Sequence, residues 1–241
     1  MKKVLLVTVL SLCVSSAFAA ETAVLKVKGT LTHSACTPEL SNGGVVDYGN
    51  IPLGELSATA NNQLGVKDVS LTIQCPSPTK VSWNMIDDRA DSVANIPVQN
   101  GLFGGGTLSS SSQIYGVGKV GDVNIGNYSL FLKLDSVTAD GKAADSIYTQ
   151  FYADGATWSK SVEGATQGAN IRDITVANTG TLEPVAFQTA VFPMATSLAI
   201  RDTTTLAIKD DTQLDGQLTI SLRYLLSLIH ISEPTRLQLI S

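Results

Sequence analysis

The sequence contains few of the residues on which catalysis and metal binding depend. Its 241 residues include only 2 histidines and 3 cysteines. A serine or threonine nucleophile needs a base held against its hydroxyl, but nothing around His33 suggests a triad, and His230 falls in a terminal stretch considered below. Two thiolates without histidine partners also make an incomplete metal site. We therefore expect neither enzyme activity nor a metal or other cofactor.

Charged residues are scarce as well. They make up 15% of the chain, compared with about a quarter in ordinary soluble domains. The formal net charge is −5, and no stretch beyond the first residues concentrates lysine or arginine. This argues against nucleic acid or an anionic membrane surface as a partner, because both require a basic surface.

The apolar run at the start of the chain is too short to span a bilayer. It extends over Val4–Val14, whereas a transmembrane helix needs about 20 apolar residues. The basic pair Lys2-Lys3 precedes it, and Ala17-Phe18-Ala19 supplies the small-x-small pattern of a signal-peptidase site. We therefore predict that residues 1–20 are a signal peptide and that the protein is exported.

Export also decides how the cysteines are interpreted. Cys13 is removed with the signal peptide, so Cys36 and Cys75 remain as an even pair in an oxidising compartment. We predict that these two residues form a disulfide. It closes a loop of 75 − 36 = 39 residues, which the chain-entropy model values at about 2–4 kcal/mol.

Apolar and polar residues alternate along much of the chain with a period of two rather than the period of about 3.6 expected for a helix. In "VSLTIQC", for example, Val69, Leu71, Ile73 and Cys75 share one face. Such alternation predicts strands at 24–32, 69–75, 80–86, 128–134, 171–176 and 218–224. Many short strands without an amphipathic helix predict an all-β fold, an antiparallel β-sandwich or barrel.

Turn signals separate these strands. The dipeptides that tolerate the positive φ of tight turns are Asn42-Gly43, Asp140-Gly141, Asp154-Gly155 and Asp215-Gly216. The longest interruption, 101–128, is rich in glycine and serine, and we interpret it as a mobile excursion or long loop. Because both of its flanks keep the strand pattern, we predict a single domain over residues 21–225.

Two motifs resemble functional sites and are given other interpretations. Gly116–Gly121 ("GVGKVG") matches the glycine spacing of a dinucleotide site, which also requires a buried strand before it and a helix after it. Neither is predicted here. Asp87-Asp88-Arg89 and Asp210-Asp211 contain adjacent carboxylates, which point to opposite faces of a strand and form no convergent pair. We interpret both doublets as solvated turn residues.

The two tryptophans receive different interpretations. Trp83 alternates with core positions in the predicted strand 80–86, which favours a core residue. Trp158 lies beside a turn in "DGATWSK" and is the candidate for an exposed ligand-stacking surface, such as a sugar site. A core position is the alternative for Trp158, and the sequence favours it.

Several segments together resemble a known family. They are "KGTLTHSACTPEL" around Cys36, "GGVVDYG", "LTIQC" ending at Cys75, "DDRA", the pair "YGVG" and "IGNY", and the final strand "GQLTISLRY". With the signal peptide, they resemble pilin subunits of chaperone–usher fimbriae, and more closely the GltF-like family of exported proteins. The resemblance covers nearly all of residues 25–225.

The resemblance implies a fold and a way of working. Pilins are immunoglobulin-like sandwiches that lack their final strand, so an apolar groove lies open beside the C-terminal strand. A periplasmic pilus chaperone fills the groove, and at the outer-membrane usher another fimbrial subunit replaces the chaperone strand, which is strand addition to a sheet edge. The matching interface residues of this sequence are Leu218, Ile220, Leu222 and Tyr224.

The function expected from the resemblance is therefore that of a structural fimbrial subunit. It would pass through the periplasm and then lie in the fimbria at the cell surface. The alternative is a carbohydrate-binding adhesin that takes a host glycan through Trp158, or a stand-alone periplasmic binding protein. A third expectation concerns assembly: if the first strand begins near Leu25, too little chain precedes it to act as a donor strand.

The last residues do not continue the pattern. After Tyr224 the alternation is lost, and "LSLIHISEPTR" resembles the translation of a sequencing adapter. We therefore predict that residues 226–241 are a non-native tail and exclude them from functional reasoning. A chain ending at Leu225 has Tyr224 as its penultimate residue, as the pilin pattern requires.

Overall fold

The computed structural model describes residues 26–28, 35–153 and 155–225. The predicted signal peptide (1–20) and the predicted tail (226–241) lie outside these residues. Of the predicted strand 24–32, only Lys26–Lys28 is described, and it takes no regular secondary structure. The rest of that prediction lies outside the described residues, among which the first strand begins at Thr37.

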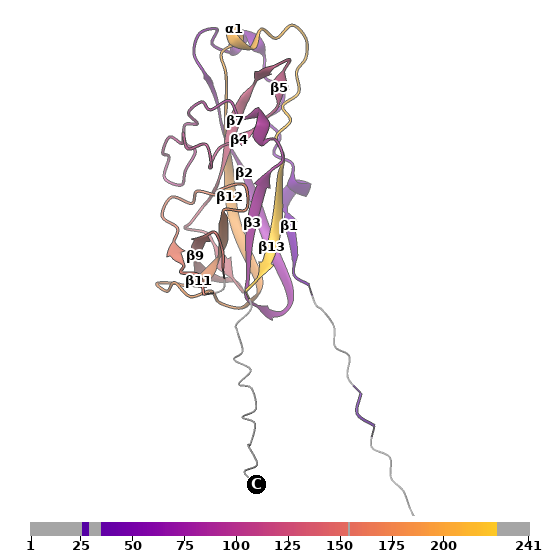
Figure 1. The fold of residues 1–241 in the computed structure, drawn as a ribbon, viewed down its shortest axis with the longest axis vertical. Coiled ribbons are helices and arrows are strands. Elements are labelled where there is room, and N and C mark those ends of the chain that lie inside the picture. Colours follow the sequence, from indigo (N-terminus) through magenta and orange to yellow (C-terminus); the bar gives the residue numbers. More distant parts are fainter. Residues whose placement is uncertain (1–25, 29–34, 154, 226–241) are drawn as a thin grey trace, which may run out of the picture. The chain divides into compact units, whose positions relative to one another are not determined.

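The regular secondary structure of the described residues from Ala35 onward is almost entirely antiparallel β-strand, which confirms the predicted all-β class (Figure 1). The strands are β1 (Thr37–Leu40), β2 (Asn62–Thr79), β3 (Val81–Asp87), β4 (Tyr115–Gly116), β5 (Lys119–Val120), β6 (Val123–Asn124), β7 (Gly126–Leu132), β8 (Thr138–Ala139), β9 (Lys142–Gln150), β10 (Ser159–Lys160), β11 (Arg172–Asn178), β12 (Phe187–Ile200) and β13 (Leu218–Tyr224). Helical structure is limited to α1 (Thr203–Leu206) and three short 3-10 turns, Ser41–Gly44, Leu53–Glu55 and Ala90–Ser92.

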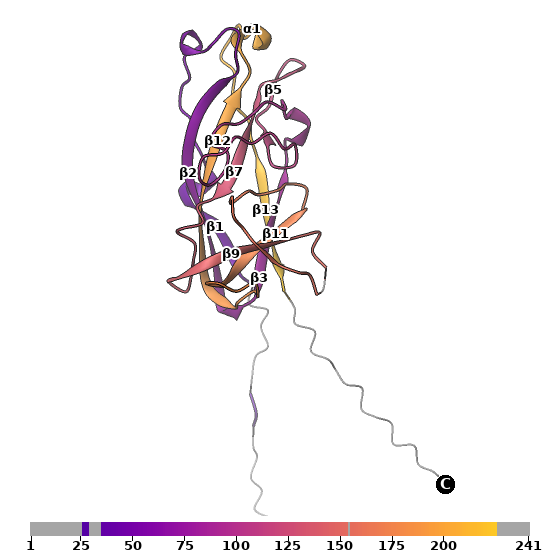
Figure 2. The ribbon, with the colours of Figure 1, turned by 90° about the vertical axis from the view of Figure 1, so that its left-hand side faces the viewer.

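One continuous sheet of 11 strands bends into two facing layers. Its path is β1-β2-β12-β8-β9-β11-β3-β13, while β10 pairs with β9, β7 with β12 and β4 with β7. The long strands β2 and β12 run side by side in one layer, and β3, β11 and β13 belong to the other (Figure 2). The first and last strands of the path, β1 and β13, each pair with only one neighbour within the described part of the chain.

The core lies between the two layers and is built by the alternating side chains that the sequence indicated. Trp83 of β3 is fully buried and meets Phe192 of β12 edge to face, with ring centroids 5.7 Å apart. Leu71 and Ile73 of β2 are also fully buried in this cluster. The predicted core position of Trp83 is therefore confirmed.

The glycine- and serine-rich segment 101–128 differs from the prediction. Its second half forms β4, β5 and β6 and begins β7, with Tyr115 and Ile125 buried. The glycines there permit close packing: a Cβ at Gly116 would overlap the carbonyl oxygen of Arg89, and a Cβ at Gly126 that of Ala199. The prediction of a mobile loop was wrong for this half, because the sequence does not distinguish glycine used for close approach from glycine used for freedom.

The turn predictions have mixed outcomes. Asn42-Gly43 and Asp140-Gly141 adopt positive φ as expected. Gly155 does so too, while Asp154 lies outside the described residues. Gly216 has no positive φ; a Cβ there would come within 2.8 Å of the Tyr128 ring, so it permits close approach rather than a turn.

Cys36 and Cys75 form the predicted disulfide, which is confirmed. Both are buried, and the bond fixes the start of β1 to β2, where Thr37 opposes Gln74. Because β1 is short and has one pairing partner, the disulfide is a large part of what holds it in place.

We expect the double variant Cys36→Ala/Cys75→Ala to lose about 2–4 kcal/mol of unfolding free energy, because its unfolded chain is no longer cross-linked. Urea unfolding followed by tryptophan fluorescence measures the loss. Reductant should destabilise the wild type by a similar amount and leave the double variant unchanged. Equal midpoints for the oxidised wild type and the variant would contradict a stabilising bond.

Candidate functional site

A cavity of about 270 Å³ opens between the two ends of the sheet. One wall is the segment from Leu40 to Tyr48, which continues β1, and the other runs from Leu214 to Ile220 at the start of β13. Residues of β2, β7 and β12 form its floor. We call this cavity the groove.

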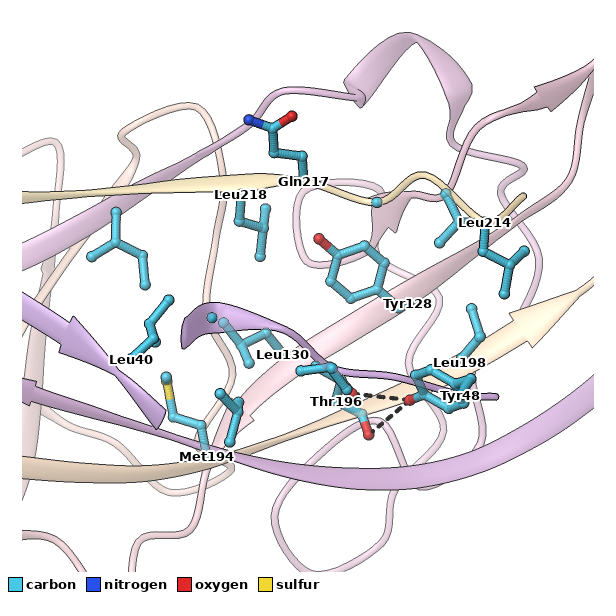
Figure 3. A pocket seen from close by; sticks show the side chains of 16 residues that line it. Leu40, Tyr48, Tyr128, Leu130, Met194, Thr196, Leu198, Leu214, Gln217 and Leu218 are labelled. Atoms are coloured by element: carbon cyan, nitrogen blue, oxygen red, sulfur yellow. Dashed lines mark hydrogen bonds between the residues drawn. The ribbon is translucent and has the colours of Figure 1, made fainter. Parts of the chain in front are cut away.

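Apolar side chains dominate the lining. Leu214 and Leu218 point into the groove, whereas Gln217 between them points away (Figure 3). Met194 and Leu198 of β12 face them from the floor. Leu218 and Ile220 are only half-buried although they pack against the main core, so the groove leaves part of that core uncovered.

Part of the backbone on each side of the groove is a sheet edge, at Leu40 of β1 and at Leu218–Ile220 of β13. Strand β1 pairs with β2 alone, and β13 pairs with β3 alone, among the residues that the structure describes. An unpaired edge presents a row of N–H and C=O groups that can accept a further strand. The groove therefore combines an apolar floor with two such edges.

Two tyrosines bring phenol groups to the groove. Tyr48 Oη bonds with Thr196 Oγ1 at 2.9 Å, and burial raises the pKa of this phenol. Burial also raises the pKa of Tyr128 well above its ordinary value. The Tyr128 ring packs edge to face on Tyr115, with centroids 5.5 Å apart. Both phenols therefore stay neutral at physiological pH.

Beyond the last groove residues, Leu40 and Ile220, a hydrogen bond bridges the segments of β1 and β13. The Cys36 backbone N–H donates to Tyr224 Oη at 2.7 Å. Of the four residues proposed from sequence as an interface, Leu218 and Ile220 line the groove. Leu222 packs against the core beyond the groove, and Tyr224 forms the bridge.

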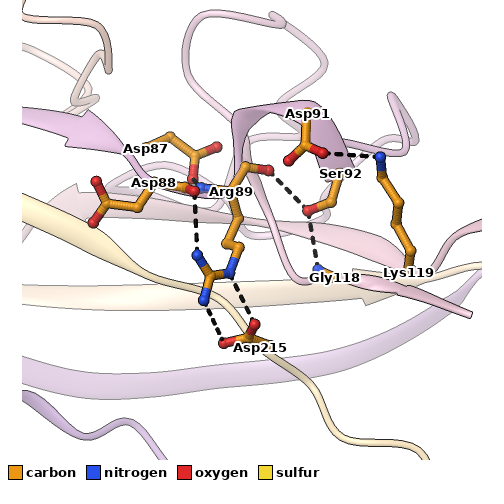
Figure 4. Close-up of polar contacts among 8 residues, drawn as sticks. All are labelled: Asp87, Asp88, Arg89, Asp91, Ser92, Gly118, Lys119 and Asp215. Atoms are coloured by element: carbon orange, nitrogen blue, oxygen red, sulfur yellow. Dashed lines mark hydrogen bonds and ion pairs between the residues drawn. The ribbon is translucent and has the colours of Figure 1, made fainter.

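The entry to β13 is held by a second motif that the sequence analysis assigned to solvated turns. Arg89 donates to both carboxylate oxygens of Asp215, from Nε at 2.8 Å and from Nη2 at 3.2 Å (Figure 4). Asp87 accepts backbone N–H bonds from Gly116 at 3.0 Å and from Arg89 at 2.9 Å. That interpretation was wrong for Asp87, which is the last residue of β3, whereas Asp88 and Arg89 do lie in a turn. Asp87 and Arg89 also join three segments that are distant in sequence.

The motif Gly116–Gly121 takes part in the same arrangement. The Gly118 N–H donates to Ser92 Oγ at 3.0 Å, and Ser92 Oγ donates to the carbonyl of Arg89 at 2.8 Å (Figure 4). The short strand β5 lies inside the motif and β6 follows it, not a helix. Gly116 therefore serves close packing against 89–92, and Gly118 and Gly121 adopt positive φ in this loop.

Sequence reasoning missed an anchor at the far end of β13. Asp173 of β11 is fully buried, and its Oδ1 accepts from Arg223 Nε at 2.9 Å. Ser82 Oγ and Asn84 Nδ2 donate to the same oxygen. The one available signal was an arginine on the outward face of the last predicted strand, and it does not identify the partner.

The candidate stacking residue Trp158 is 9% exposed. It packs with Ile147 and Ala177, and the Tyr152 ring lies 6.3 Å from it. The idea of an exposed stacking surface was wrong for this residue, because the sheet and the neighbouring loop cover the indole. The core alternative is the arrangement found.

The described residues contain neither a membrane-spanning helix nor a cluster of metal-binding side chains. None of their helices is long and apolar enough to cross a membrane. No group of three or more histidine, cysteine, aspartate or glutamate side chains among them could hold a metal ion.

The sequence is similar to one described family and to two proteins of Escherichia coli. Residues 25–129 match the family described as protein of unknown function (DUF1120). The chain is 30% identical over 224 residues to uncharacterized protein YhcF of Escherichia coli (strain K12), a match that spans 87% of this chain and 93% of that protein. It is 29% identical over 222 residues to protein GltF of the same organism, spanning 83% and 87% respectively.

We expect Gly116→Ala to lower the free energy of unfolding by about 2 kcal/mol or more, because the added methyl overlaps the Arg89 carbonyl and forces the backbone to move. Gly54→Ala is the matched control, since its Cβ meets nothing within 4 Å, and should stay within about 0.5 kcal/mol of wild type. Chemical denaturation measures both. Equal stability of the two variants would contradict close packing at Gly116.

A pH prediction follows from Asp87. Burial raises its pKa above the ordinary 3.8, against the opposing effect of the Gly116 and Arg89 N–H groups. Its contribution to stability is therefore fully present below about pH 4 and is lost as pH rises through the folded-state pKa. The free energy of unfolding of the wild type minus that of Asp87→Asn should therefore fall as pH rises through this window. Chemical denaturation at several pH values measures it.

Asp145 provides the control of opposite sign. Its hydrogen bond with Lys160 lowers its pKa, so its contribution is present above about pH 4 and is lost as pH falls. The difference between wild type and Asp145→Asn should therefore grow with rising pH. If both stability differences changed with pH in the same direction, the raised pKa of Asp87 would be contradicted.

Proposed function

Because the chain belongs to the GltF-like family of proteins of unknown function (DUF1120), we propose its function from the groove: it is a structural subunit of a chaperone–usher fimbria, assembled by strand addition. The observation that carries the proposal is an apolar groove lying between two unpaired sheet edges. An added strand would place alternate apolar side chains on the floor and pair its backbone with the free edge of β13.

The physical argument is that the groove is unfavourable when empty. Half-buried Leu218 and Ile220 border it, and the edges beside them have no partner strand within the described residues. Exposed edges next to apolar surface invite uncontrolled association. A periplasmic chaperone that lends a strand, followed by a neighbouring subunit delivered at the outer-membrane usher, would remove this hazard throughout assembly.

The expectation of a poor donor rested on a first strand that begins near Leu25. Residues 21–25 and 29–34 lie outside those that the structure describes, so this expectation stays a prediction. The stretch from Glu21 to Ala35 includes an alternating series, Leu25, Val27, Gly29 and Leu31. It therefore carries the pattern that a strand added to the groove requires.

Localisation follows from the same proposal. The Cys36–Cys75 disulfide is compatible with an exported protein, and a fimbrial subunit would pass through the periplasm to the cell surface. The alternative, a host-glycan adhesin or a stand-alone periplasmic binding protein, had its aromatic platform at Trp158. Burial of that ring removes the observation that favoured it.

The experiment measures whether the groove binds an extended peptide. A labelled synthetic peptide of residues 21–35 is added to the exported chain, and its fluorescence anisotropy is recorded. We expect saturable binding, weakened at least about tenfold by Ile220→Asp, because a carboxylate would be placed on the apolar wall.

Ser221→Asp is the matched control. Ser221 neighbours Ile220 on the same strand but is exposed, so this variant should bind the peptide like wild type. Absence of binding by the wild type, or equal weakening by both substitutions, would overturn the proposed role of the groove.

A further inference from the structure

We infer that the groove takes an extended segment of limited length, and that the Tyr224–Cys36 bond sets the end at which this segment stops. The inference rests on the proposed function, because it concerns the strand that occupies the same groove. It goes further by assigning the length of that strand, the end at which it stops and the residues that limit it.

The first step is the bridge itself. Tyr224 Oη accepts the Cys36 N–H at 2.7 Å, although the two residues are 188 positions apart. Cys36 is fixed to β2 by the disulfide, and Tyr224 opposes Val81 on β3. Both ends of the bridge are therefore held by the sheet, so a strand between β1 and β13 would have to break this bond to pass.

The second step concerns the edge of β1. N–H groups of alternate residues in a strand point to the same side, so those of Cys36 and Leu40 face the groove side, with position 38 between them. Residue 38 is a proline, which has no N–H. At the bridged end, one donor of the edge is therefore taken by Tyr224 and the next is missing. This part of β1 offers no free N–H to an incoming strand.

The third step is the contrast with the opposite end. There the walls are Tyr48 and Leu214, and the residues before Leu214 are largely exposed. Tyr48 is bonded to the floor residue Thr196, not across to the other wall. An extended segment can therefore enter at this end and advance as far as Ile220.

The fourth step gives the length. The wall from Leu214 to Ile220 matches an extended segment of about seven residues, at about 3.3 Å per residue. Leu222 lies beyond the lining and already packs in the core. The occupant is thus a short segment with apolar side chains at alternate positions, and residues added beyond Ile220 approach the Tyr224–Cys36 bond and find no free N–H on β1.

The experiment compares two synthetic alternating valine–threonine peptides, of about seven and about eleven residues, on the exported chain. For the wild type we expect equal dissociation constants, because the extra residues of the longer peptide lie beside the Tyr224–Cys36 bond and find no free N–H on β1. Tyr224→Phe frees the Cys36 N–H, and the longer peptide should then bind about threefold tighter than the shorter one. Tyr224→Phe/Pro38→Ala adds a second donor and should raise this preference to about tenfold.

Tyr48→Phe is the matched control, because it removes a phenol hydroxyl at the open end and should leave the length preference unchanged. Hydrogen exchange supplies a second readout. The Cys36 amide should exchange slowly in the wild type with or without peptide, and rapidly in Tyr224→Phe until the longer peptide is added.

The outcomes separate the two proposals. If neither peptide binds the wild type, the proposed function and this inference both fail. If both peptides bind but the length preference is the same in the wild type and in Tyr224→Phe, the groove accepts a strand and only the stop at Tyr224 is overturned. A Cys36 amide that exchanges rapidly in the wild type would overturn the stop as well.

Discussion

The gap between β1 and β13 is the constraint on which the rest of the structure depends. The sheet bends until its first and last strands lie on opposite sides of the groove, yet along the groove no pairing joins them within the described residues. Exposed strand edges beside an apolar floor can pair with a further strand. The proposed strand addition would pair such an edge and cover the apolar floor at the same time.

A groove with open edges can persist only if its walls are held by other contacts. The wall at β13 is fixed at its entry by the Arg89–Asp215 ion pair and at its end by Arg223 on buried Asp173. The wall at β1 is fixed by the disulfide. The surface ion pair contributes little energy by itself, but it positions the start of β13 where the motif around Asp87 also binds Gly116. These contacts with the rest of the sheet therefore hold each wall of the groove in position, without side chains packed between the two walls.

Glycine has two roles in this chain, and the difference between them explains the largest departure from the predicted fold. At Asn42-Gly43 a positive φ makes a turn, as the sequence indicates. At Gly116 and Gly216 the missing Cβ lets another segment approach, and the segment that looked like a loop becomes part of the packing. Trp158 illustrates the converse, since its place beside a turn suggested exposure, while the sheet and the loop bury it. At Gly116, Gly216 and Trp158 the residues that pack against the site come from a distant part of the chain.

The sequence by itself determined the elements that depend on local pattern. Alternation located β13 and the central parts of β2, β3, β7 and β11, and with them the all-β class, while the count and compartment of the cysteines determined the disulfide. Tertiary structure alone decided that the first strand is Thr37–Leu40, that Arg89 meets Asp215, and that Tyr224 bridges to Cys36. Side-chain periodicity reports which face of a strand is buried, but it carries no information about which distant edge, carboxylate or N–H that face will meet.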